Sequence, residues 1–186
     1  MLKGMTAALV ALLALQAKDG KDPNIAIKAD IGVSMRRPPK NDEWDFKDKG
    51  SFFSNSQLCL THKVDTIAIE IFCQDKASGF GYYDIKDAAN GEYKNISGFA
   101  SLTEPKKVAT SNSAKLPGGG AGNVNSSYLE MTFKKEDKPM ELRMWVFIGK
   151  NQNLYKVLMT CDEGMYKKHQ KVADFALASV DIFKVK

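Results

Sequence analysis

The first patterned segment of the chain, residues 25–35, has an apolar side chain at every second position from Ile25 to Met35. A repeat of two is the period at which side chains alternate across a β-strand, so the segment predicts one strand with one buried face. We expect the strand to end before Pro38-Pro39, because proline has no N–H to donate to a strand ladder.

Later segments also carry strand patterns. We expect strands at residues 57–62, 66–73, 106–115, 128–135, 140–148 and 154–159, and a short closing strand or tail at 182–185. The polar segment 106–115 suits the edge of a sheet, and residues 136–139 form the turn of the clearest hairpin. Apolar side chains fill both faces of the far end of segment 140–148, so we expect that end to be covered on both sides.

Two segments change to the spacing of three and four that is typical of amphipathic helices. The first is residues 84–100, and the second begins after Thr160 or Asp162, either of which can cap a helix. The inner stripe expected for the second helix consists of Met165, His169, Val172, Ala173, Ala176 and Val180. Between these helices, the glycine-rich residues 117–122 predict a flexible loop. A strand pattern follows them, whereas a phosphate-binding loop leads into a helix, so we expect no phosphate-binding loop here.

The order of these elements resembles the PsbP-like family, which includes the photosystem II extrinsic subunit and a nuclear Ran-binding import factor. The matching pieces are Arg37-Pro38-Pro39 with Trp44-Asp45-Phe46, and the segment 155–160 that leads into the last helix. The resemblance covers about residues 25–185. It implies an α+β fold in which an antiparallel sheet is flanked by helices, an α/β/α sandwich. It also implies a non-catalytic binding or assembly protein, and no functional residue of the family can be placed on this chain.

The N-terminus has the parts of a secretory signal peptide: a basic Lys3, an unbroken apolar stretch at residues 7–15 and a polar exit. We expect a signal peptide at 1–17, a polar lead-in at 18–24 and one domain at 25–186. Leu15 stands where the cleavage site prefers a smaller residue. The alternative is an N-terminal helix packed on the domain. The leader predicts an extracytoplasmic protein, periplasmic or secreted, whose membrane contact is limited to an uncleaved leader.

Composition agrees with one soluble globular domain, since 44% of the 186 residues are hydrophobic and 26% are charged. The net charge is +5, and it falls by one unit if a leader carrying Lys3 is removed. The basic residues are scattered among acidic ones, so we expect no nucleic-acid partner.

Cysteine and histidine give little sign of reactive chemistry. Cys59 and Cys73 are offset on neighbouring predicted strands and Cys161 makes the number odd, so we expect three buried, reduced thiols. His62 is expected at the surface and His169 at a helix interface, neither with a ligating neighbour in sequence. We therefore predict no metal site, no cofactor and no catalytic residue. An enzyme would need one of these histidines in a cleft beside an acid or a nucleophile.

The best candidate for binding is the loop that carries Arg36, Arg37, Lys40 and Trp44. Prolines stiffen this loop, and arginine and tryptophan are common interface anchors. The alternative is a bend that ends the strand and returns Trp44 to the core. The sequence thus favours a non-enzymatic binding or assembly module with a protein partner. A carrier of a lipid or other apolar ligand, using some of the eight methionines and ten phenylalanines, is the second hypothesis.

Overall fold

A computed structural model describes residues 22–38, 42–48, 50, 52, 55–75 and 85–184. The predicted leader at 1–17 and Lys40 lie outside the described residues. The elements, in chain order, are β1 (Ile25–Lys28), β2 (Val33–Arg36), β3 (Trp44–Lys47), β4 (Leu58–His62), β5 (Ile67–Gln74), η2 (Ile85–Asp87), α2 (Ala88–Ser97), β6 (Leu102–Ala114), η3 (Pro117–Asn123), β7 (Ser126–Lys135), β8 (Lys138–Ile148), β9 (Leu154–Asp162), α3 (Met165–Ala178) and β10 (Asp181–Ile182). No helix among the described residues has the length and apolarity that crossing a bilayer requires.

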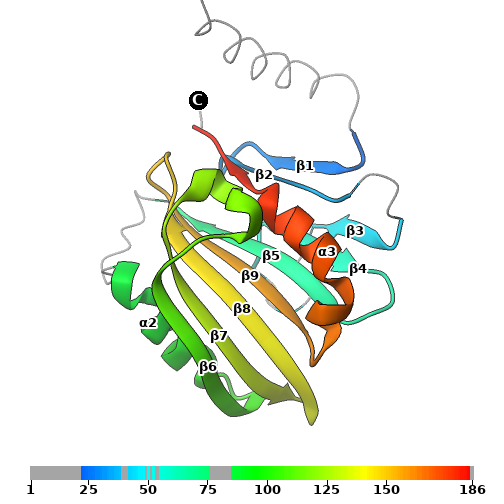
Figure 1. The fold of residues 1–186 in the computed structure, drawn as a ribbon, viewed down its shortest axis with the longest axis vertical. Helices are drawn as coiled ribbons and strands as arrows, with labels where there is room; N and C mark the ends of the chain where they lie inside the picture. Colours follow the sequence, from blue (N-terminus) through cyan, green and yellow to red (C-terminus); the bar gives the residue numbers. More distant parts are fainter. Residues whose placement is uncertain are drawn as a thin grey trace, which may run out of the picture.

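Seven strands form one antiparallel sheet in the order β3-β4-β5-β9-β8-β7-β6, and β1-β2-β10 form a small second sheet. Figure 1 shows α3 on one face of the large sheet and α2 on the other. Each helix has its own buried apolar cluster against the sheet. The α+β fold with helices on both faces of an antiparallel sheet is therefore confirmed.

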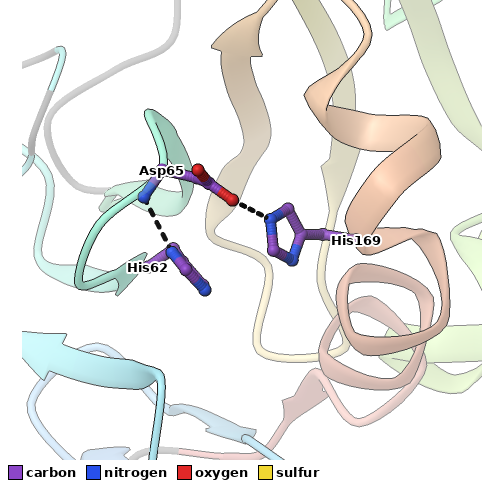
Figure 2. A group of neighbouring side chains, drawn as sticks. All are labelled: His62, Asp65 and His169. Atoms are coloured by element: carbon purple, nitrogen blue, oxygen red, sulfur yellow. Dashed lines mark hydrogen bonds and ion pairs between the residues drawn. The ribbon is translucent and has the colours of Figure 1, made fainter.

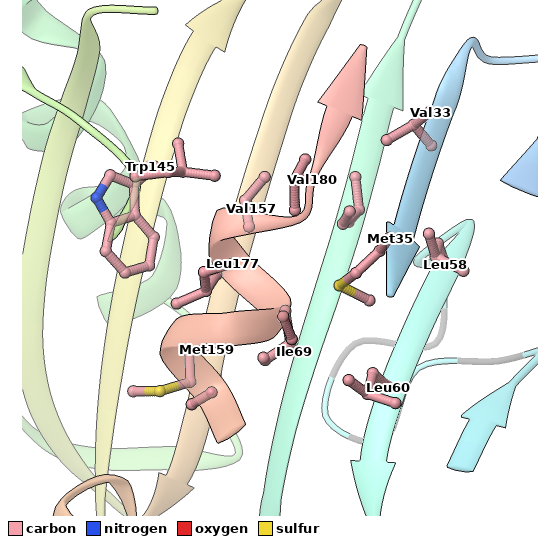
Figure 3. Close-up of a cluster of buried hydrophobic side chains, with 14 of the residues drawn as sticks. Val33, Met35, Leu58, Leu60, Ile69, Trp145, Val157, Met159, Leu177 and Val180 are labelled. Carbon is pink, nitrogen blue, oxygen red and sulfur yellow. The ribbon is translucent and has the colours of Figure 1, made fainter. Parts of the chain in front are cut away.

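The cluster beneath α3 joins the two sheets. Leu177 and Val180, at the end of α3, pack with Val157 and Met159 of β9 (Figure 3). Met35 of β2 is fully buried in the same cluster, so the small sheet and α3 share one core. The far end of β8 is covered on both faces, as predicted, because Trp145 and Phe147 belong to this cluster and Met144 and Val146 to the opposite one.

The single strand predicted at residues 25–35 is wrong, because the chain reverses within it. Gly32 adopts a φ of 66°, and Lys28 pairs with Val33 to make a hairpin. In this hairpin the odd-numbered residues of β1 pair with even-numbered residues of β2, as Ile27 does with Ser34. Paired residues on neighbouring strands lie on the same face of the sheet. Ile27 consequently points outward beside Ser34 and is 47% exposed.

Three other expectations need smaller corrections. The β7–β8 turn contains only Glu136 and Asp137, whose φ values of 52° and 62° suit a two-residue hairpin turn. The last helix begins after Gly164, because β9 continues through Asp162. The glycine-rich loop, η3, packs against α3: Gly120 is buried, and a Cβ there would lie 2.1 Å from the carbonyl oxygen of Leu177.

Candidate functional site

The two histidines of the chain meet where the turn between β4 and β5 touches α3. His62 ends β4, Asp65 lies in the following turn, and His169 lies in the second turn of α3. The centroids of the two imidazole rings are 4.5 Å apart. Figure 2 shows Asp65 hydrogen-bonded to both residues, through its backbone N–H to His62 and through its carboxylate to His169. We call His62, Asp65 and His169 the histidine cluster.

Asp65 is the centre of the cluster. Its Oδ2 lies 2.6 Å from Nε2 of His169 and 2.6 Å from Nζ of Lys168. These hydrogen bonds, that of Lys168 first and that of His169 second, lower the pKa of Asp65 from its usual 3.8 to about 2. The carboxylate therefore ties the β4–β5 turn to the first turns of α3.

Trp44 completes the packing around the two rings. It is fully buried and meets His62 and His169 edge-on, at centroid distances of 5.4 and 5.7 Å. The surface position expected for His62 is thus wrong, since His62 is buried between β3 and α3. Sequence reasoning missed the cluster because its members are separated by up to about a hundred residues and only the fold brings them together.

The three side chains are close enough to suggest a metal site, since their ligand atoms lie within 4.8 Å of one another. The hydrogen bonds argue against ligation. Nδ1 of His62 accepts from the backbone N–H groups of Val64 and Asp65, at 3.2 and 2.8 Å, so the neutral ring carries its proton on Nε2 and has no lone pair there. Oδ2 of Asp65 already contacts the ammonium group of Lys168 and the imidazole of His169. The arrangement fits a clamp that positions α3.

Of the four residues predicted to bind a partner, the structure describes Arg36, Arg37 and Trp44. Arg37 is directed into the protein: its Nε donates to Asn24 at 3.1 Å, and its guanidinium donates to the backbone oxygen of Trp44. Trp44 is wholly buried and lacks the exposed surface that a binding anchor needs. The burial of Trp44 agrees with the alternative interpretation, a bend that returns Trp44 to the core. Arg36 is exposed at the end of β2, and for Arg36 and Lys40 a binding role stays a prediction.

The backbone of Arg36 lies beside the C-terminal end of α3. Ser179, at the end of the helix, accepts a hydrogen bond from the backbone N–H of Arg36 at 2.8 Å. Lys167, Lys171 and Phe175 precede Ser179 at intervals of four, so they share one row on the helix surface. Phe175 is 41% exposed. We call Arg36, Lys167, Lys171 and Phe175 the α3 ridge.

Two surface hollows bear on the carrier hypothesis. The larger, of about 290 Å³, adjoins the histidine cluster and is lined by charged residues including Lys135 and Asp162. The smaller, of about 160 Å³, is lined by Gln57 and Lys156 among others. An apolar ligand calls for a larger, mainly apolar cavity. Neither hollow favours a carrier.

The thiols show no activation. Cys59 and Cys161 are buried and Cys73 is half-buried, all three without a disulfide. Burial raises the pKa of Cys161 to about 12, and it also raises that of Cys73. A thiol that stays protonated is a poor nucleophile, so Cys73 and Cys161 act as packing groups.

Comparison with known proteins identifies the fold. No family model and no curated protein matches the chain. Cyanobacterial PsbP (CyanoP) from Synechocystis sp. PCC 6803 superposes with a TM-score of 0.54 at 9% identity, over 86% of this chain and 91% of its own. This chain has a PsbP-like fold. The resemblance inferred from the sequence is thus confirmed at the level of the fold.

Two further solved structures agree with this fold. LpqN, involved in cell envelope biogenesis of Mycobacterium tuberculosis, has a TM-score of 0.53 at 14% identity, over 88% of this chain and 87% of its own. A protein from Bacteroides thetaiotaomicron VPI-5482 has a TM-score of 0.50 at 15% identity, over 87% of this chain and 48% of its own. The chain therefore spans about half the length of the Bacteroides protein.

Proposed function

We propose that the chain is a non-enzymatic extracytoplasmic protein that binds or helps to assemble another protein, and that the α3 ridge is its contact surface. The leader pattern at residues 1–17 supports export from the cytoplasm. The similarity in fold to LpqN, a protein involved in cell envelope biogenesis, agrees with an extracytoplasmic location. The PsbP-like fold supports a binding role rather than catalysis.

The observation that carries the proposal is the exposure of Phe175 within a row of cations. A single exposed apolar side chain is ordinary on a protein surface. Phe175 differs because Lys171 precedes it by one turn, and Ser179, one turn beyond it, is hydrogen-bonded to the backbone of the exposed Arg36. Aromatic and arginine side chains are enriched among the residues that dominate binding energy at interfaces. The histidine cluster on the opposite side of α3 fixes the helix that presents them.

Affinity capture tests the proposal. The full chain, immobilised through its C-terminus, is exposed to the cell-envelope fraction of its source organism, alongside the double variant Phe175→Ala/Lys171→Ala. The matched control is Val64→Ala, since Val64 is 87% exposed on the β4–β5 turn. We expect the wild-type chain and the control to retain one protein in near-stoichiometric amount, and the double variant to lose at least about 90% of it.

Two results would contradict the proposal. If all three proteins retain the partner equally, the ridge is not the contact surface. If the wild-type chain retains no protein above background, the proposed binding function is wrong. A thermal unfolding curve of the double variant that matches the wild type shows that a lost partner does not reflect a lost fold.

A further inference from the structure

Resting on this proposed function, we infer that the α3 ridge binds an acidic segment of the partner, which places an apolar side chain against Phe175. The inference concerns the chemistry of the partner. It follows from the charges of the ridge, its length and the way it is held.

The cations of the ridge form no ion pair within the described part of the chain, and the nearby carboxylate of Asp174 accepts a hydrogen bond from Tyr166. Arg36, Lys167 and Lys171 make no ion pair with another described residue, whereas neighbouring Lys168 is paired with Asp65. Side chains four apart on a helix are about 6 Å from each other. That spacing is shorter than the Debye length of about 8 Å at physiological ionic strength, so their fields add. The ridge therefore attracts an extended run of negative charge.

The geometry sets the size of the segment. The row from Lys167 to Ser179 spans twelve residues of helix rise, about 18 Å. An extended peptide covers that length with about six residues. The backbone of Arg36 lies at one end of this row, because Ser179 also donates to its backbone oxygen at 3.2 Å. The segment thus meets the two lysines before Phe175 and reaches the exposed Arg36 at the end of β2.

An anionic membrane is the other surface that attracts lysine and arginine. Basic segments that bind anionic lipids carry about four to eight such residues in a cluster. The ridge has three, of which two are on α3 and one is at the end of β2. This sparse arrangement fits the complementary side chains of a protein segment better than a lipid surface.

Photo-crosslinking in the source organism tests the inference on the full chain. Phe175 is replaced by p-benzoylphenylalanine, and Val64 is replaced in the same way as an exposed control. After irradiation, adducts are mapped by mass spectrometry. We expect the adduct at position 175 to lie in a protein segment with net negative charge over about ten residues. We expect its yield to fall about tenfold in a Lys167→Glu/Lys171→Glu background.

Charge reversal of Lys94, an exposed residue of α2 on the opposite face of the sheet, serves as the control and should leave the yield unchanged. A protein adduct on a neutral or basic segment overturns the inference and leaves the proposed function standing. A crosslinking yield at position 175 that is unchanged in the Lys167→Glu/Lys171→Glu background has the same two consequences. An adduct to lipid alone, or no protein adduct above that at position 64, overturns both.

Discussion

At the residue scale, Asp65 connects the β4–β5 turn to α3 through one carboxylate. It accepts from Lys168 and is hydrogen-bonded to His169, and its backbone N–H reaches His62. These contacts form only in the folded chain. The ionised form of Asp65 is therefore favoured by folding, and stability depends on pH in the range where this carboxyl group titrates.

We expect the free energy of unfolding to fall as the pH drops from about 3.8 toward about 2, because Asp65 then takes up its proton in the unfolded chain before the folded one. Asp65 contributes its full share to the free energy of unfolding above about pH 3.8, and this contribution is lost below about pH 2. In Asp65→Asn this component is absent, so the pH dependence is shallower. Urea unfolding at a series of pH values measures it. Asp137→Asn, in the exposed β7–β8 turn, is the control, and equal slopes for Asp65→Asn and wild type would refute the assignment.

The protonation of His62 gives a second prediction at this scale. Because Nε2 of the neutral His62 ring carries the proton, it cannot bind zinc. We therefore expect zinc, added after chelator treatment, to shift the unfolding temperature of the wild type no more than that of His62→Gln. A bound ion at a hundred times its Kd would add about 2.7 kcal/mol. A zinc-dependent rise of several degrees in the wild type, absent from the variant, would establish a metal site and contradict the clamp.

At the scale of elements, the sequence predicted most strands and both amphipathic helices from local periodicity. It failed where the decisive contact is distant. The alternation of residues 25–35 is compatible with a strand or with a hairpin, and only pairing with Val33 distinguishes them. The residues of the histidine cluster lie in separate elements, so no local pattern predicts their contact. The sequence left two roles open for Trp44, an anchor at an interface or a residue of the core. Its complete burial favours the second role.

The glycine-rich loop gives a prediction at the scale of elements. Gly120 has an ordinary φ of −49°, but a Cβ there would lie 2.1 Å from backbone of α3. We expect Gly120→Ala to destabilise the fold by about 2–3 kcal/mol through this overlap. Gly122→Ala meets nothing within 4 Å and bears only the cost of a φ of 71°, about 1 kcal/mol. Urea unfolding compares them, and equal losses would mean that η3 does not pack tightly on α3.

At the scale of the whole molecule, the α3 ridge can be compared with the outer edge of β6 as a surface for a partner. The β6 edge is long, but its pairing with β7 contains three register shifts, and the strand carries Pro105, Lys106 and Lys107. Bulges, prolines and lysines are the features by which sheet edges resist further strand pairing. The ridge has no such protection, and it combines exposed aromatic surface with unpaired charge.

Amide hydrogen exchange of the full chain, with and without the partner retained in the capture experiment, tests this choice most directly. The account predicts slower exchange in α3 and at the end of β2 near Arg36, with β6 unchanged. Slower exchange along β6, with α3 and β2 unaffected, would contradict it.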